Sequence, residues 1–257
     1  ALFAFILPAT KQKETVALKT TAPVATTAPI NTPTPIATPE PTATPEPTPE
    51  PFEMTCGDYK LTITGEEARI DDYTGDIVDL VIPAELNGYR VTSIGEAAFA
   101  FCSFLTSVTI PEGVTSIGIS AFRDCNWLKT IKIPASMVMI EPFAFERCVR
   151  LANLKITVGN ISYLCSDGVL FNANGTLLHT ALCAVVKGDY VVPDSVLRIE
   201  DGAFALCNKL NSVTIPIGVT SIGNAAFWSC ENMRSVTIPE GVTNLGAHAF
   251  EGCYSLK

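Results

Sequence analysis

Phenylalanine and cysteine recur at a fixed spacing along this chain, and that spacing constrains the fold more than any other feature. The motif A-F-x-x-C occurs in two groups of three copies, and within each group successive cysteines lie 23 residues apart. The cysteines are Cys102, Cys125 and Cys148 in the first group and Cys207, Cys230 and Cys253 in the second. A period of roughly 20 to 50 residues is typical of a solenoid, because one repeat cannot bury its apolar face alone and must stack on its neighbours.

Each repeat contains one short strand pattern and one tight return. Residues 108–110 (V-T-I) alternate apolar and polar side chains, as in a half-buried strand, and the other copies do the same. Pro111 ends the strand because it cannot donate to the ladder, and Gly113 supplies the turn. The A-F-x-x-C segment has near-helical spacing, which predicts a single helical turn at most. We therefore expect an α/β solenoid with a parallel β-sheet on its concave face and ~4.8 Å between coils.

The frame I-G-x-x-A-F-x-x-C-x-x-L-x-x-V-x-I-P resembles the BspA-like, or Treponema-type, leucine-rich repeat family of cell-surface proteins. Full or partial copies run over residues 80–256. The resemblance implies a solenoid used for adhesion or protein contact, without a conserved catalytic residue. The sequence departs from the family pattern at Thr157, where proline is expected, so we expect a less regular sheet there.

Flanking segments also resemble family features and set the expected boundaries. Residues 57–69 are similar to an N-terminal hairpin cap, and residues 163–193 to an irregular interlude between repeat blocks. A solenoid over residues 52–257 is thus expected to divide into four parts. These are a cap (52–90), a first repeat block (91–156), an interlude (157–193) and a second repeat block (194–257).

The first 51 residues have a different composition. Residues 1–8 are apolar and are followed by lysines, which predicts that residues 1–20 carry the remnant of a secretory signal peptide, with a buried strand as the alternative. Residues 21–51 hold ten Pro and nine Thr among 31 residues and no Gly or aromatic residue. This run predicts a disordered or extended Pro/Thr-rich stalk, with P-x-x-P docking as the alternative.

Charge and motif content argue against several classes of function. The chain has 17 Lys and Arg against 26 Asp and Glu, a formal net charge of -9, which disfavours nucleic acid as a partner. The G-x-x-x-x-G spacing at Gly113 and Gly118 lacks the lysine of a nucleotide-binding loop. His179 and His248 lie outside any triad or zinc-protease motif. We therefore expect no enzyme activity, no nucleotide and no cofactor.

An acidic cluster and the cysteines leave alternatives open. The cluster holds Asp71, Asp72, Asp76 and Asp79, and a solvated cap turn is favoured over a calcium site, so no metal is expected. The recurring cysteines are expected to form a buried apolar stack, although cysteines on stacked coils are also close enough for disulfides. Cys56, Cys165 and Cys183 lie outside this stack and are better candidates for a bridge. Two N-x-S/T sequons begin at Asn160 and Asn174.

The outward positions of the strands indicate where a partner binds. Lysines occupy this column in two repeats, and aromatic side chains precede the strands on adjacent coils. Aromatic residues beside cations are frequent at binding hot spots. The candidate contact residues are Phe101, Phe104, Trp127, Lys129, Lys132 and Lys155.

These observations lead to a functional hypothesis. The chain is expected to be a secreted or cell-surface binding module that recognises a protein or glycan on a host or neighbouring cell. Two alternatives remain: the non-catalytic repeat arm of a larger secreted enzyme, and a structural spacer of the cell envelope.

Overall fold

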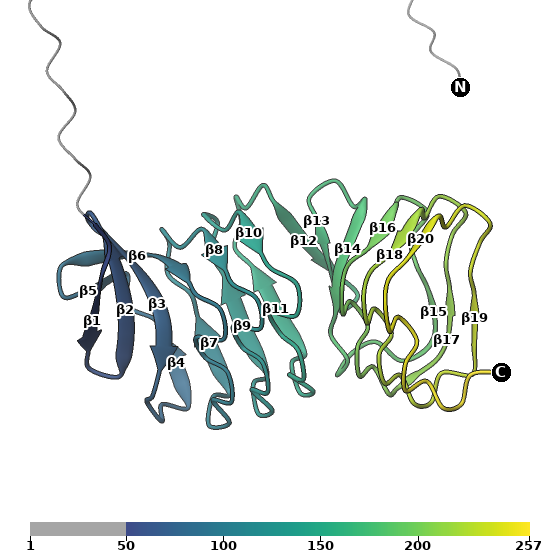
Figure 1. Ribbon diagram of the computed structural model, residues 1–257, viewed down its shortest axis with the longest axis horizontal. Coiled ribbons are helices and arrows are strands. Elements are labelled where there is room, and N and C mark those ends of the chain that lie inside the picture. The colour runs from purple at the N-terminus through teal and green to yellow at the C-terminus, as the bar shows by residue number, and fades with distance from the viewer. Residues whose placement is uncertain (1–49) are drawn as a thin grey trace, which may run out of the picture. The chain divides into compact units, whose positions relative to one another are not determined.

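The computed structural model describes residues 50–257, which form a β-solenoid (Figure 1). The expected signal-peptide remnant (1–20) and nearly all of the Pro/Thr-rich stalk (21–51) lie outside the described residues. The described part of the chain forms no helix long and apolar enough to span a membrane.

One series of parallel strands comes from the V-x-I segments of the repeats, and we call the surface that it forms the V-x-I face. It consists of two sheets, ordered β4-β7-β9-β11 and β15-β17-β19. The strands of the first are β4 (Asp79–Val81), β7 (Ser107–Thr109), β9 (Thr130–Ile133) and β11 (Asn153–Ile156). Those of the second are β15 (Gly188–Val191), β17 (Leu210–Thr214) and β19 (Ser235–Thr237). Thr109 pairs with Lys132, and Lys132 with Lys155, so each coil advances the register by one repeat and the predicted parallel sheet is confirmed.

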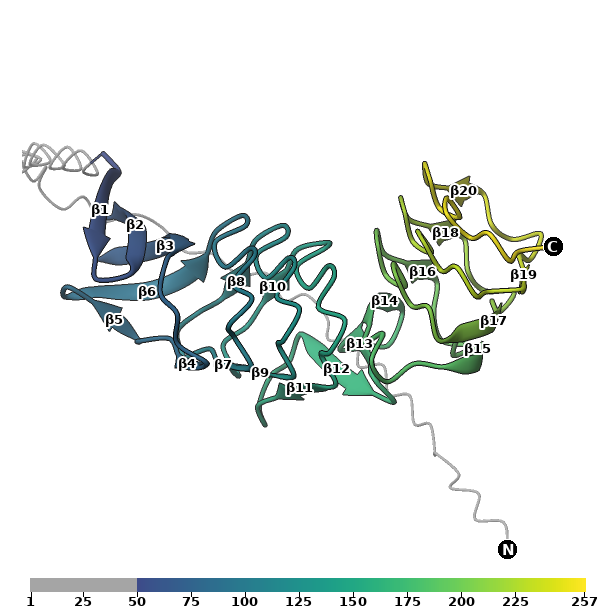
Figure 2. The same cartoon turned by 90° about the horizontal axis from the view of Figure 1, so that it is seen from below.

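A second series of short strands comes from the S-I segments, and antiparallel strands precede it in both halves of the solenoid (Figure 2). The first sheet contains β1 (Phe52–Cys56), β2 (Tyr59–Thr64), β3 (Glu67–Tyr73), β5 (Glu85–Leu86), β6 (Tyr89–Ile94), β8 (Ser116–Ile117) and β10 (Met139–Ile140). The second contains β12 (Tyr163–Ser166), β13 (Val169–Asn172), β14 (Leu177–Ala181), β16 (Arg198–Ile199), β18 (Ser221–Ile222) and β20 (Asn244–Leu245). The hairpin β1–β2 precedes the first coil.

The third side of each coil, which we call the turn face, is the A-F-x-x-C segment, and here the expectation of a helical turn is wrong. In the first copy Ala97 and Phe101 have φ values of 54° and 63°, in the left-handed region. The backbone N–H groups of Ala97, Phe99 and Phe101 donate to carbonyls of the next coil instead of their own. A helix needs these donors inside the segment, so inter-coil bonding excludes it. The α/β label is therefore not confirmed, because the described residues contain strands and turns only.

The core is a column of phenyl rings flanked by branched aliphatic side chains. Phe99, Phe122 and Phe145 stack at centroid distances of 5.1 and 5.9 Å in the first block. In the second block, Phe204, Phe227 and Phe250 stack at 4.9 and 5.2 Å. Because each ring is covered by the next, removal of one coil exposes its neighbour, which is why a single repeat cannot fold alone.

The cysteines form the expected buried stack in each block, with a hydrogen-bonding role that composition does not reveal. The thiols of Cys125 and Cys148 donate to the carbonyls of Phe99 and Phe122 of the preceding coil, at 3.1 and 3.0 Å. Burial raises the pKa of the Cys102 thiol to about 12, so it remains protonated at neutral pH. Thiols of this kind are donors within the core and are not nucleophiles.

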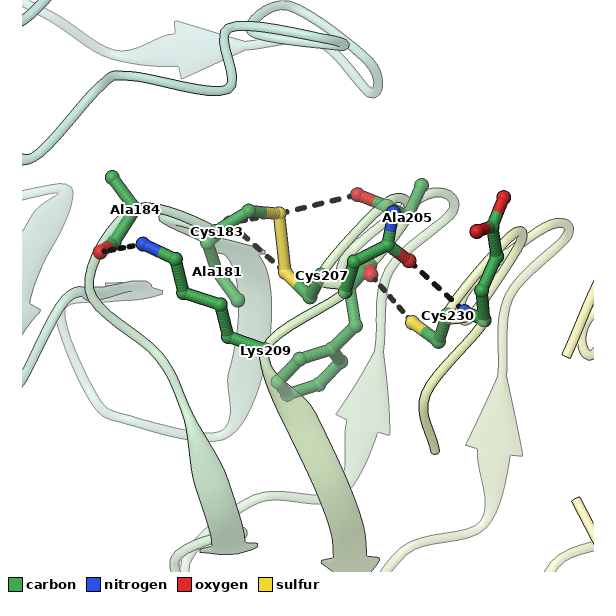
Figure 3. The surroundings of a disulfide bond; sticks show 10 residues. Ala181, Cys183, Ala184, Ala205, Cys207, Lys209 and Cys230 are labelled. Carbon is green, nitrogen blue, oxygen red and sulfur yellow. Dashed lines mark hydrogen bonds between the residues drawn. A yellow bond between two sulfur atoms is a disulfide. The ribbon is translucent and has the colours of Figure 1, made fainter. Parts of the chain in front are cut away.

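One disulfide joins the interlude to the second block. Cys183 bonds to Cys207, a member of the stack, with their Cα atoms 4.5 Å apart (Figure 3). Of the three bridge candidates, Cys183 is therefore paired, whereas Cys56 and Cys165 are free. The partner of Cys183 comes from the stack because Cys183 occupies the equivalent position one coil earlier.

The interlude separates the two repeat blocks and contacts both. On β13, Leu170 packs into the hydrophobic cluster of the first block, and its neighbours Val169 and Phe171 pack into that of the second. Alternate side chains of a strand point to opposite faces, so an apolar run such as V-L-F can be buried on both sides.

Two interlude side chains complete the last S-I strand of the first block. The hydroxyl of Tyr163 accepts from the backbone N–H of Ile140 at 2.7 Å, and Nε2 of His179 donates to the Ile140 carbonyl at 2.6 Å. These groups bind the backbone of β10, which ends the first sheet.

Candidate functional site

The aromatic candidates lie at or beside the turn face and are largely exposed. Phe101 is 66% exposed, Phe104 62% and Trp127 49%. Phe104 and Trp127 occupy equivalent positions on adjacent coils, three residues before β7 and β9. Phe101 is held outward by its left-handed backbone conformation. Large apolar side chains displayed in this way lose solvent-exposed area only when a partner covers them.

The lysine candidates lie on or next to the V-x-I face. Lys132 and Lys155 are register partners on β9 and β11, and both are exposed. Lys129 directly precedes β9 and is also exposed. Neighbouring parallel strands lie about 4.8 Å apart, so two ammonium groups project side by side and create a positive spot on an acidic protein.

Arginines, which the sequence analysis did not select, occupy the aromatic rings. The guanidinium carbon of Arg150 lies 3.7 Å from the centroid of the Trp127 ring, and that of Arg123 lies 5.5 Å from the Phe101 ring. Arg150 is one repeat beyond Trp127, so the 23-residue spacing that aligns Phe104 with Trp127 was the signal that could have identified it. An arginine stacked on an indole fixes both side chains and adds roughly 0.5–2 kcal/mol.

An acidic residue holds the remaining cations in place. Asp124 accepts hydrogen bonds from Nε of Arg147 at 2.6 Å and from Nε of Arg123 at 3.3 Å. The two arginine side chains are nearly half exposed, so these ion pairs add little to stability and serve mainly to orient the guanidinium groups.

We call the set of these side chains the basic–aromatic surface. It comprises the six candidates and the three arginines: Phe101, Phe104, Trp127, Lys129, Lys132, Lys155, Arg123, Arg147 and Arg150. The structure links the aromatic residues to arginines through cation–π contacts, and it places the lysines along the adjacent strands. The chemistry of this surface is that of non-covalent contact with an anionic and apolar partner.

Residues considered for chemistry are placed elsewhere. His179 is buried and binds the Ile140 carbonyl, whereas His248 is exposed and pairs with Glu251. Asp79 accepts hydrogen bonds from Thr106 and Ser107, which lower the pKa of its carboxyl group. Within residues 50–257, no group of three or more His, Cys, Asp or Glu side chains is arranged to hold a metal ion.

Comparison with protein families and known structures identifies relatives of the whole solenoid. The model of the BspA type leucine-rich repeat region matches residues 75–173 and 188–257, with 6 copies. No curated protein sequence matches the chain.

Among solved structures, a leucine-rich repeat protein from Eubacterium ventriosum has 23% sequence identity and a TM-score of 0.56, over 80% of this chain and 71% of that one. The leucine-rich repeat protein TpLRR of T. pallidum has 28% identity and a TM-score of 0.53, over 80% of this chain and 91% of that one.

Proposed function

Because the chain belongs to the BspA-type leucine-rich repeat family, we propose that it is a secreted or cell-surface module that binds a protein on a host or neighbouring cell through its basic–aromatic surface. The observation that carries this proposal is the stacking of Arg150 on the exposed ring of Trp127. Tryptophan and arginine are the residue types most enriched among binding hot spots.

The charge of the surface specifies the partner's chemistry. Three lysines and three arginines gather in the first repeat block of a chain whose net charge is -9. A partner surface with carboxylates around an apolar centre complements both the cations and the rings. A glycan is the alternative partner that we expected from the sequence, and stacking on Trp127 without ionic-strength dependence would distinguish it.

Rigidity supports a binding role over a purely structural one. Trp127 and Arg150 come from adjacent coils whose backbones are hydrogen-bonded to each other. Side chains that are already ordered lose less conformational entropy on binding, which favours affinity. A spacer of the cell envelope has no need of such an arrangement.

The repeat itself provides a matched control for testing this proposal. We predict that Trp127→Ala with Lys132→Glu weakens binding of the labelled chain to the surface of partner cells by more than about tenfold, since hot-spot truncations cost ≥ ~2 kcal/mol. The equivalent second-block variant, Asn232→Ala with Thr237→Glu, is expected to bind like the unmodified chain. Flow cytometry over a range of protein concentrations measures both. Equal binding by the two variants would contradict the proposal, and absence of saturable binding by the unmodified chain would favour the spacer.

A further inference from the structure

A notch interrupts the turn face where the first repeat block meets the second. It has a volume of about 310 Å³. Phe143 and Glu146 line it from the first block, and Ala205, Ala225, Trp228, His248 and Glu251 line it from the second. None of these residues belongs to the basic–aromatic surface.

The repeat register explains why the notch exists. One column of the turn face holds the residues two positions before each core phenylalanine: Phe143, then Gly202, Ala225 and His248. A second column, one position after the phenylalanine, holds Glu146, then Ala205, Trp228 and Glu251. Small residues therefore lie between coils that carry large ones.

Contact across the interlude fixes the first wall of the notch. The ring of Phe143 lies against Gly202, where any added Cβ would collide with it. Gly202 also has a φ of 65°, a conformation that glycine adopts without strain. Phe143 is thus held over the second block although 59 residues separate the two positions.

The notch combines aromatic walls with negative charge. Phe143 and Trp228 supply the rings, and Glu146 and Glu251 supply two carboxylates. Among the described residues, no lysine or arginine lines it; Arg123 approaches Glu146 to 3.8 Å from outside, and His248 pairs with Glu251. An ammonium group on an apolar stem matches rings and carboxylates together, because cation–π attraction and ion pairing then act on one group.

We propose that this notch binds an alkylammonium group, specifically the side chain of a lysine on a partner protein. The methylene stem of lysine fills the space beside Ala205 and Ala225, and its ammonium group reaches the carboxylates. A saccharide needs several hydrogen-bonding groups in fixed positions, and the lining is mostly apolar. This site goes beyond the proposed function, since it uses different residues and the opposite charge.

The two tryptophans make the site directly observable. In the Trp127→Phe variant, Trp228 is the one remaining tryptophan and lies in the notch. We expect N-acetyl-lysine methylamide to change its fluorescence saturably. The norleucine analogue, which keeps most of the alkyl stem and lacks the ammonium group, is expected to bind roughly fivefold to thirtyfold more weakly. Equal responses to the two compounds, or a saturable response to cellobiose instead, would overturn the assignment.

Isosteric variants test the carboxylates without altering the shape of the notch. Glu146→Gln with Glu251→Gln in the Trp127→Phe background is expected to weaken binding of the lysine compound at least about fivefold. Glu231→Gln with Glu240→Gln, at exposed positions outside the notch, is the matched control. Thermal unfolding midpoints verify that all variants fold. Unchanged affinity in the notch variant would refute the proposal whatever the outcome at the basic–aromatic surface.

Discussion

At the scale of single residues, Asn160 replaces backbone hydrogen bonds where the regular repeat stops. Its side-chain amide donates to the carbonyls of Pro134 and Met137 at 3.0 and 2.9 Å. Its Oδ1 accepts from the N–H groups of Ser162 and Tyr163 at 2.9 and 2.8 Å. The asparagine of this sequon is therefore engaged inside the fold and is not a free glycan acceptor.

We predict that Asn160→Ala lowers the free energy of unfolding by roughly 2–4 kcal/mol, since it leaves several backbone groups without partners. Asn174→Ala, at the second sequon, removes only local bonds to Thr176 and is expected to cost less than about 1 kcal/mol. Urea denaturation of both variants measures the difference. Equal losses would show that Asn160 has no special role.

His179 makes stability depend on pH. Burial lowers the pKa of its imidazole below the usual 6.5, outweighing the nearby carboxylates of Glu141 and Glu200. Nε2 donates to a carbonyl, so Nδ1 is the unprotonated nitrogen, and it has no hydrogen-bonding partner among the described residues. Protonation would therefore place an unpaired N–H in the core.

As the pH falls through about 6.5, the unfolded chain takes up this proton before the folded chain does, so stability present above that pH is lost below it. We predict that the free energy of unfolding decreases between pH 7.5 and 5.5, and that His179→Gln flattens this dependence. Denaturation series at several pH values measure it. If the variant kept the full slope, other groups would be responsible.

At the scale of elements, the strands could be predicted from the sequence and the turn conformation could not. Alternation of apolar and β-branched residues in each V-x-I segment identifies β7, β9 and their equivalents, because burial on one face determines that pattern. The A-F-x-x-C segment has a helix-like spacing, but its backbone groups bond to the adjacent coil. That preference arises only after stacking, so no local pattern reveals it.

Glycine at the end of the S-I segment shows the same dependence on stacking. A Cβ added at Gly118 would lie 2.7 Å from the backbone nitrogen of Glu96 on the preceding coil. The sequence marks this glycine as a turn residue, whereas the structure shows that close approach of two coils requires it.

The strand β13 of the interlude is the element that joins the two blocks. We predict that Leu170→Ala lowers the free energy of unfolding by roughly 2–5 kcal/mol, because it leaves a cavity against the first block. Leu164→Ala, on the neighbouring strand β12 and partly exposed, is expected to cost less than about 1.5 kcal/mol. Chemical denaturation compares the two. Similar small losses would mean that β13 does not support the first block.

At the scale of the molecule, repetition turns positions 23 residues apart into neighbours. This arithmetic was sufficient to place Phe104 beside Trp127 and Lys132 beside Lys155. It applied equally to Arg150, which was missed because the search considered lysines and aromatic residues separately. The notch could not be predicted, because the interlude breaks the period and only the folded chain shows that Phe143 meets Gly202.

The central claim is that the interlude unites both repeat blocks in one cooperative solenoid, and Tyr163, His179 and β13 are the contacts that should enforce it. Each block carries one of the two tryptophans, Trp127 in the first and Trp228 in the second. The most direct measurement is equilibrium unfolding of the single-tryptophan variants Trp127→Phe and Trp228→Phe, followed by fluorescence and, as a shared reference, by circular dichroism. One coincident transition in both variants is the expected result. Two separate midpoints, one for each tryptophan, would show that the blocks unfold independently and would contradict the account.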